Sequence, residues 1–144
     1  ITPDAFGLAL LGLLCEKREA GVDVRLMVDS RGTPSLTRAY FGLQLLDTLA
    51  GLGAEVRVYN TVENEILKGD IRKVIASNHD KLLIVDGNTA ILGGRNISVE
   101  YLVDPRDMPD AFIDLDIVVD GEAAAIALTR AFTVELGSTH ARAI

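Results

Sequence analysis

The first half of the chain alternates between stretches with helical and with strand-like spacing of apolar residues. Residues 4–20 carry apolar side chains at helical spacing, which predicts a helix with Asp4 as its N-cap after Pro3. Gly21 suits the C′ position, where helices commonly end in a left-handed conformation. Residues 22–29, VDVRLMVD, then have the pattern that is typical of a β-strand.

The same order of elements follows a second time. Residues 38–52 predict another amphipathic helix, which Ser35 or Thr37 could cap. Gly53 then precedes a strand over residues 54–60. The two helix-to-strand passages read GVDVRL and GAEVRV. Passages of this kind arise when successive strands lie parallel in one sheet.

The second half predicts a hairpin, a loop, a strand and a closing helix. Two strands, over residues 76–85 and 89–93, flank the turn sequence DGN, which is a good hairpin signal. Prolines and aspartates indicate a loop over residues 99–111. The pattern then favours a strand over 113–121 and a helix over 122–136.

The remaining segment does not divide the chain. Residues 60–74 have weak periodicity and mixed charge, which predicts an exposed connection with a short helix at most. No stretch has the composition of a linker. We therefore expect one domain over residues 1–144, with an α/β sandwich fold.

The composition is that of a folded protein and argues against a general nucleic-acid binder. Of the 144 residues, 49% are apolar and none is tryptophan, so aliphatic side chains must fill the core. The formal net charge is −7 and no block of lysine or arginine occurs, whereas non-specific nucleic-acid affinity depends on such cations. The single cysteine, Cys15, lies in an apolar helical run, which predicts a buried free thiol. The longest apolar run, residues 5–14, is too short to span a bilayer.

A histidine and a lysine stand two residues apart in the first hairpin strand. Because side chains alternate across a strand, His79 and Lys81 are predicted to project from the same face. Asp86 has the opposite parity and lies at the turn. An ammonium group can hold the anionic oxygens of a phosphate while an imidazole attacks phosphorus or moves a proton.

Two glycines and an asparagine follow at the end of the second hairpin strand. Gly93 and Gly94 leave room for a close backbone approach, so that peptide N–H groups can face an anion. Asn96 adds an uncharged side-chain donor. Together with His79 and Lys81, these residues predict a phosphate site.

This set of residues resembles the signature of the phospholipase D superfamily, H-x-K-x4-D-x6-G-[GS]-x-N. The chain has the required residue type at each fixed position, namely His79, Lys81, Asp86, Gly93, Gly94 and Asn96. The segments 21–29 and 112–121 are similar to the family's strands before and after the motif, and GGRNISVEY at 93–101 is similar to the first motif of bacterial cardiolipin-synthase-like members. The resemblance implies a sandwich of a mixed, largely parallel sheet flanked by helices, lacking the family's first strand and helix.

The resemblance also implies a role for each residue. His79 would form a covalent phosphohistidine or protonate the leaving alcohol, while Lys81 and Asn96 would hold the phosphate oxygens. Asp114 is the expected carboxylate that orients the imidazole, with Asp116 on the same face as the alternative. The family's reaction requires no metal, and no cofactor is expected.

Asp86 is interpreted as mainly structural, although it belongs to the motif. The chain has one such motif, because its other histidine, His140, has no lysine two places on and is expected to be a tail residue. Chemistry that needs two histidines must borrow the second, either from the same full-length chain, which we favour, or from a homodimer partner.

Three functions therefore stay open from the sequence. The first is a phospholipid hydrolase or phosphatidyltransferase, either cytoplasmic or peripheral at the cytoplasmic membrane. The second is a homodimeric phosphodiesterase or nuclease, which the acidic composition disfavours. The third is a catalytically silent half of a longer protein.

Overall fold

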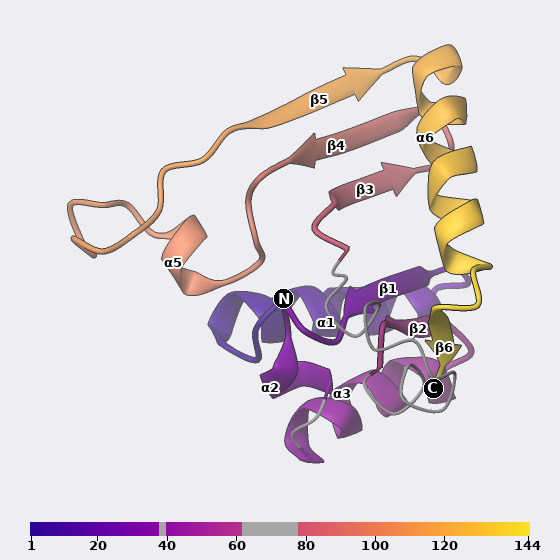
Figure 1. Ribbon diagram of the computed structural model, residues 1–144, viewed down its shortest axis with the longest axis horizontal. Helices are drawn as coiled ribbons and strands as arrows, with labels where there is room; N and C mark the ends of the chain where they lie inside the picture. The colour runs from indigo at the N-terminus through magenta and orange to yellow at the C-terminus, as the bar shows by residue number, and fades with distance from the viewer. Residues whose placement is uncertain (38–39, 62–77) are drawn as a thin grey trace.

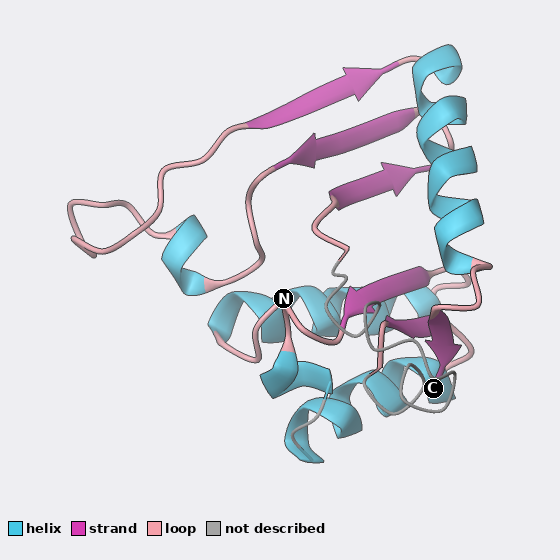
Figure 2. Ribbon diagram, viewed as in Figure 1, coloured by secondary structure: helices cyan, strands magenta, loops and turns pink. Residues whose placement is uncertain are grey.

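The computed structural model describes residues 1–37, 40–61 and 78–144. Its strands are β1 (Arg25–Asp29), β2 (Glu55–Tyr59), β3 (Lys81–Val85), β4 (Thr89–Gly93), β5 (Asp116–Asp120) and β6 (Ala141–Ala143). Its helices are α1 (Ala5–Glu19), α2 (Pro34–Thr37), α3 (Tyr40–Gly51), α5 (Val99–Leu102) and α6 (Glu122–Leu136) (Figure 2). The predicted connection over 60–74 lies almost entirely outside the described residues.

The strands form two three-stranded sheets, in the orders β1-β2-β6 and β3-β4-β5 (Figure 1). β1 and β2 pair in parallel, as the repeated helix-to-strand passage predicts. The other described pairings, β2–β6, β3–β4 and β4–β5, are antiparallel. The mixed α/β class is confirmed, but the expectation of a largely parallel sheet is wrong for the described strands. Short connections such as the hairpin turn permit antiparallel pairing, whereas a parallel pair needs a crossover.

Helix α1 begins and ends where its sequence predicts. Asp4 caps its N-terminus, because Oδ1 accepts hydrogen bonds from the backbone N–H groups of Phe6 (3.0 Å) and Gly7 (3.1 Å). Gly21 follows its end with a φ of 89°, a conformation that glycine adopts without strain. Cys15, predicted to be buried, is half-buried at the margin of the core.

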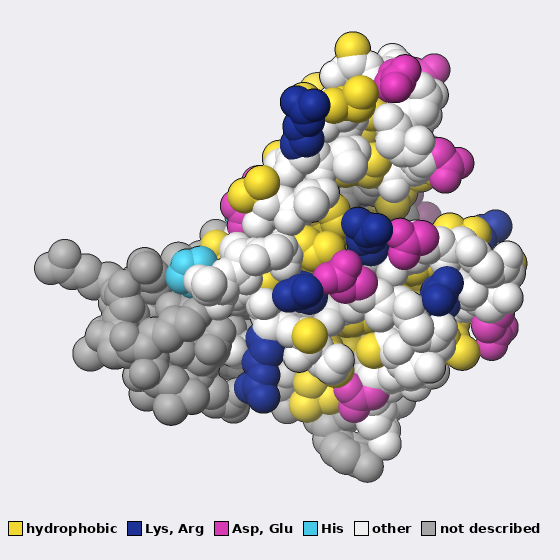
Figure 3. Space-filling view, turned by 90° about the vertical axis from the view of Figure 1, so that its right-hand side faces the viewer, with side chains coloured by type: hydrophobic (Ala, Val, Ile, Leu, Met, Phe, Trp, Pro, Cys, Tyr) yellow, Lys and Arg dark blue, Asp and Glu magenta, His cyan; other side chains and the backbone are white. Residues whose placement is uncertain are grey.

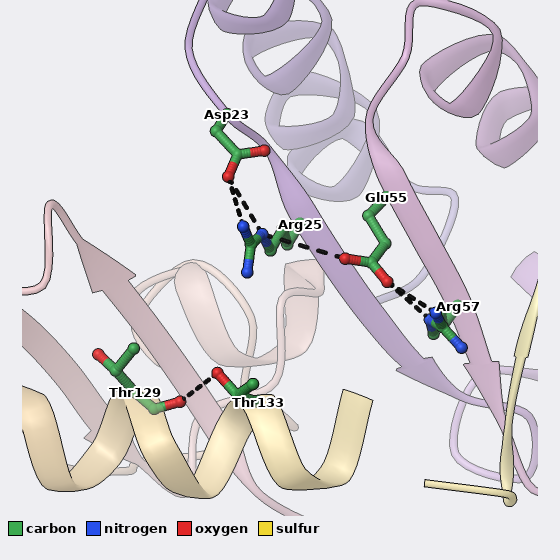
Figure 4. A network of polar contacts seen from close by, with 6 residues as sticks. All are labelled: Asp23, Arg25, Glu55, Arg57, Thr129 and Thr133. Carbon is green, nitrogen blue, oxygen red and sulfur yellow. Dashed lines mark hydrogen bonds and ion pairs between the residues drawn. The ribbon is translucent and has the colours of Figure 1, made fainter. Parts of the chain in front are cut away.

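The parallel pair carries its charges on one side and its core on the other. Alternating charges bond along and across β1 and β2, through Asp23–Arg25 (2.9 Å), Arg25–Glu55 (4.0 Å) and Glu55–Arg57 (2.8 Å) (Figure 4). Such exposed ion pairs contribute little to stability. The buried side chains of α1, β1, α2, α3, β2 and the turns between them form one apolar cluster, namely Leu11, Val24, Val28, Leu36, Leu46, Leu49, Ala54, Val56 and Val58.

Helix α6 links the two sheets. It packs against β3, β4 and β5 and then runs down to the parallel sheet, where the chain turns into β6 (Figure 1). Beneath its C-terminal half, Met27, Tyr59, Leu82 and Phe132 line a cavity of about 110 Å³. The first two of these residues belong to the parallel sheet and Leu82 to the hairpin sheet, so the cavity marks the junction between the sheets.

The C-terminal segment belongs to the sheet, so the expectation that His140 is a tail residue is wrong. The carbonyl of His140 accepts a hydrogen bond from the Asn60 N–H (2.9 Å), and its ring lies 6.0 Å from that of Tyr59. β6 follows immediately and completes the edge of β2. The partners are about 80 positions upstream in the chain, so no local pattern reveals them.

Two segments contain short helices that the pattern did not indicate. Ser35 and Thr37, expected to cap a helix, lie within α2, and the Thr37 hydroxyl donates to the carbonyl of Thr33 (3.0 Å). The predicted loop over 99–111 begins with α5. Helices of four residues are too short to show the periodicity on which the prediction depends.

Candidate functional site

The structure brings His79 and Lys81 into direct contact. The Lys81 Nζ lies 2.9 Å from His79 Nδ1 and donates a hydrogen bond to the His79 carbonyl at 2.6 Å. The imidazole is exposed, and β3 begins at Lys81, so His79 stands just before the strand rather than on it as predicted. Because the ammonium can act only as a donor, this contact is a hydrogen bond in the tautomer whose Nδ1 is unprotonated and whose proton is on Nε2.

Lys81 is a partly desolvated cation among carboxylates. Burial lowers the pKa of its ammonium group, while the carboxylates of Asp80, Asp114 and Asp29 act to raise it. Burial is the larger effect, so the pKa of Lys81 lies below its ordinary value and the carboxylates limit the shift. The site therefore presents an ammonium group and an imidazole side by side, with Asp114 close enough to act on the ammonium group.

The hairpin sheet sets the position of the glycine pair. Gly93 pairs with Lys81 on one side and with Asp116 on the other. A Cβ on Gly93 would lie 2.5 Å from the carbonyl oxygen of Leu115, and a Cβ on Gly94 would lie 2.6 Å from the carboxylate oxygens of Asp114. The segment leading into β5 thus makes the close approach that the two glycines permit.

Asp114 lies beside the glycine pair without touching the imidazole. Its Oδ1 accepts a hydrogen bond from the Leu115 N–H at 2.7 Å. Across the described part of the chain, neither Asp114 nor Asp116 bonds to His79, whose ring nitrogen contacts Lys81 instead. The carboxylate–imidazole hydrogen bond expected from the sequence is thus absent from this arrangement, and Asp114 precedes β5 instead of lying on it.

Arg95 is the residue that sequence reasoning missed. Its guanidinium group donates to the carboxylate of Asp116 (2.7 Å), to the carbonyl of Tyr101 (2.7 Å) and to the carbonyl of Asp114 (3.0 Å). Asp116, the alternative carboxylate for orienting the imidazole, is engaged in a half-buried ion pair with Arg95. Asp114 is therefore the remaining candidate for that role. The signal in the sequence was its position between the motif's glycines and asparagine. Its closeness to Asp114 and Asp116 appears only in the folded chain.

The remaining motif residues lie at the two ends of the hairpin. Asn96 is half-buried, and its side-chain amide forms no hydrogen bond with the residues that the structure describes. Asp86 and Gly87 have φ values of 53° and 64°, and the Asn88 N–H donates to the Val85 carbonyl at 3.1 Å. Asp86 and Gly87 are thus the central residues of a tight turn, within the three-residue connection 86–88 that joins the two strands.

Asp86 is therefore distant from the site. It follows the last residue of β3, while Lys81 is the first, and five residues of strand span roughly 16 Å. Positive φ is tolerated by aspartate better than by most residues. The geometry agrees with a structural role for Asp86 at the turn.

An open hollow of about 340 Å³ adjoins Asp114. It is lined by Arg95, Tyr101, Phe112 and Asp114 among others, and the rings of Tyr101 and Phe112 lie 4.8 Å apart. Since ligand sites are commonly concave with a few convergent polar groups, this hollow is a candidate space for part of a substrate.

Comparison with known proteins shows to which family the chain is similar. Residues 7–133 match the family described as cardiolipin synthase, PLD-like domain. Cardiolipin synthase 2 of Bacillus anthracis is 32% identical over 102 residues, which is 71% of this chain and 18% of that protein. Cardiolipin synthase C of Escherichia coli (strain K12) is 32% identical over 123 residues, which is 82% of this chain and 24% of that protein. The chain thus spans about a fifth to a quarter of the length of these relatives.

A solved structure shares the fold. The crystal structure of Nuc, a phospholipase D family member from Salmonella typhimurium, matches with a TM-score of 0.62 and 17% sequence identity. The match covers 94% of this chain and 72% of that one.

Proposed function

The chain belongs to the family of phospholipase D-like domains of cardiolipin synthases, and we propose that it cleaves or transfers a phospholipid phosphodiester through a covalent phosphohistidine at His79. The contact of 2.9 Å between Lys81 Nζ and His79 Nδ1 is the observation that carries this proposal. It supports the proposal because an ammonium group, which can hold phosphate oxygens, then lies beside an exposed imidazole, which can act as the nucleophile.

The first step forms one bond and breaks another. Nε2 of His79 attacks phosphorus, a P–N bond forms, and the P–O bond to the leaving alcohol breaks as that oxygen takes a proton from a second histidine. A water molecule or an alcohol then gives a proton to the second histidine and attacks phosphorus. The P–N bond breaks and the imidazole is restored, giving hydrolysis or transfer respectively.

The described arrangement must change before Nε2 can attack. Its lone pair is free only if the ring proton is on Nδ1, the nitrogen that Lys81 contacts. An anionic phosphate draws the ammonium of Lys81 toward its oxygens, where Asn96 is available as a further donor. Asp114, whose carboxylate acts on Lys81, is then our candidate to accept the Nδ1 proton in a hydrogen bond and to fix that tautomer.

The second histidine comes from outside the motif of this chain. His140, the other histidine, lies in the turn before β6 at the edge of the parallel sheet. We infer that a second motif, in the same longer protein or in a second copy, supplies the acid. A chain that lacks this partner is expected to be silent, so this alternative is part of the test below.

Phospholipid is the favoured substrate class for two reasons. The relatives that the chain matches are cardiolipin synthases. The net charge of −7 and the interspersed basic and acidic side chains on the face seen in Figure 3 do not provide the cationic stripe that a nucleic-acid backbone requires. Within the described ranges, each helix falls short of the length and apolar character that crossing a bilayer requires. We propose peripheral contact with a membrane surface.

Trapping the intermediate tests this function. The parent chain, alone and within any longer protein that contains it, is incubated with phosphatidylglycerol carrying a radioactive phosphorus and is quenched in alkali, which preserves phosphohistidine. We expect label on the parent and on the matched control His140→Asn, and none on His79→Asn. Equal labelling of His79→Asn would show that His79 is not the nucleophile. Absence of label from both parent forms would favour the silent-half alternative.

A further inference from the structure

Asp29, at the end of β1, is bonded to the residue that precedes His79. Its Oδ2 accepts a hydrogen bond from the Asn78 N–H at 2.6 Å, although the two residues are 49 positions apart. Its Oδ1 accepts from the N–H groups of Arg31 (2.7 Å) and Gly32 (2.9 Å) in the turn after the strand. One half-buried carboxylate therefore joins the parallel sheet to the motif.

The backbone on both sides of His79 is held by side chains. The Oδ1 of Asn78 accepts a hydrogen bond from the Asp80 N–H at 2.9 Å, and Lys81 donates to the His79 carbonyl. The pairing of β3 with β4 begins at Lys81, so no described strand pairing fixes these three peptide groups. Through the hydrogen bond to the Asn78 N–H, Asp29 connects residues 78–80 to the parallel sheet, beside which the apolar cluster lies.

We propose that Asp29 is a positioning residue for His79, an inference that rests on the nucleophilic role proposed above. A displacement of about 1 Å in a reacting group can cost a large factor in rate, so a nucleophile that stands before its strand needs another anchor. Asp29 supplies that anchor from the end of a buried parallel strand. Its charge also acts to raise the pKa of the neighbouring Lys81 ammonium group, against the larger lowering by burial.

The test compares two variants that remove the same charge. Asp29→Ala removes both acceptor oxygens, whereas Asp29→Asn removes the charge and keeps one acceptor. Asp23→Asn is the control, because Asp23 is an exposed carboxylate near the start of the same strand. Inorganic phosphate is titrated into each isotope-labelled protein while the imidazole NMR signal of His79 is followed. The signal of His140, the other histidine, is the internal reference.

We expect Asp29→Ala to bind phosphate about tenfold more weakly at His79 than Asp29→Asn does, and Asp23→Asn to bind as the parent does. The amide proton of Asn78 should also exchange with solvent faster in Asp29→Ala, while the amide protons of β1 and β2 keep their protection. A purely local role in the turn would instead change Arg31 and Gly32 alone. That result, or equal phosphate binding by the two Asp29 variants, would overturn the proposal.

A substitute variant and amide exchange at Asn78 test the role of Asp29 if the first comparison fails. If Asp29→Ala does not fold, Asn78→Pro replaces it, since proline lacks the N–H that donates to Asp29, removes the acceptor for the Asp80 N–H and leaves the turn after β1 intact. It should weaken phosphate binding and speed exchange at Asp80, and an unchanged His79 signal would count against the proposal. If the parent's His79 signal does not respond to phosphate, the proposed function fails, while amide exchange at Asn78 still decides whether Asp29 anchors the segment.

Discussion

The parallel-sheet half and the hairpin half of this molecule are built differently. The apolar cluster of buried residues lies entirely in α1, β1, α2, α3, β2 and the turns between them. In the hairpin sheet, Ala90 is fully buried beneath α6, but the opposite face exposes a row across three strands. The side chains of that row, Leu83, Ile91 and Val118, are 49%, 37% and 65% exposed.

The buried core that stabilises the fold and the motif residues proposed for the chemistry therefore lie in different halves of the molecule. The parallel half has the buried aliphatic side chains that drive folding. The hairpin half carries the motif. It is stabilised by strand pairing, by the turn at Asp86 and by the three hydrogen bonds that Arg95 donates. Its placement depends on α6 and on a few hydrogen bonds across the junction, including those that Asp29 and Asp4 accept. Substitutions in the two halves should therefore have different consequences.

The largest effect is expected from the core of the parallel half. Leu49 is fully buried, so Leu49→Ala should lower the free energy of unfolding by about 3 kcal/mol, through lost burial and the cavity that remains. Urea denaturation measures this loss. The matched control is Leu115→Ala in the hairpin half, where the side chain is 74% exposed and the expected change is within about 0.5 kcal/mol. An equal loss in both variants would show that the hairpin half is covered in solution and would remove the contrast.

The glycine pair should give a smaller and asymmetric effect. Gly93→Ala places a Cβ 2.5 Å from the Leu115 carbonyl oxygen and 2.9 Å from the Asp116 Cα, so the backbone must shift, and we expect a loss of about 2 kcal/mol. Gly94→Ala meets only the side chain of Asp114, which can rotate away, and should cost less than about 1 kcal/mol. Urea denaturation of the two variants provides the comparison. The reverse order would mean that the carboxylate of Asp114 is held more rigidly than the backbone beside Gly93.

The hairpin turn should give an effect near 1 kcal/mol. Asp86→Val puts a β-branched residue at a φ of 53° and should lower the free energy of unfolding by about 1–2 kcal/mol, whereas Asp86→Asn should change it by a few tenths. Because the turn is distant from Lys81, the phosphate response of the His79 signal should be the same in both variants. Loss of that response in Asp86→Asn, with stability retained, would assign Asp86 to the chemistry.

Much of this architecture is predictable because its signals are local. The cap at Asp4, the positive φ of Gly21 and the turn after Val85 all follow from residue types at fixed offsets in the chain. The contact between His79 and Lys81 also follows from their spacing. These features depend on neighbours within a few positions, which a single sequence displays.

The rest depends on partners that are distant in the chain. The predicted strands over 76–85 and 113–121 begin several residues before β3 and β5, but pairing ends at the row of Lys81, Gly93 and Asp116, since the chain leaves the sheet there. His79 consequently falls outside its predicted strand. The contacts of Arg95 and Asp29 join segments whose proximity exists only in the folded chain, so the sequence does not reveal the partners of either residue.

The smallest expected effect concerns the hydrogen bond by which α1 meets the segment after the hairpin. The Oδ2 of Asp4 accepts from the Val99 N–H at 2.8 Å, in addition to the cap contacts. Although burial acts to raise the pKa of Asp4, hydrogen bonds from Thr2, Val99 and the first turn of α1 outweigh it and hold the pKa below its ordinary value. A carboxyl group with a depressed folded-state pKa contributes stability that is present above its unfolded pKa and is lost as the pH falls through the folded one.

Asp4→Asn keeps a good N-cap but cannot titrate, so it isolates this contribution. We expect the variant to lose about 0.5 kcal/mol at pH 7 and to approach the parent in acid, once the pH has fallen below the folded-state pKa of Asp4 and the parent's carboxyl group is protonated. Urea denaturation at both pH values measures the difference, with Asp47→Asn on the exposed side of α3 as the charge-matched control. Because Asp4 bonds to both α1 and Val99, faster amide exchange at Val99 alone would locate the loss at the junction. A loss that is the same at both pH values would mean that the charge of Asp4 does not hold the two segments together.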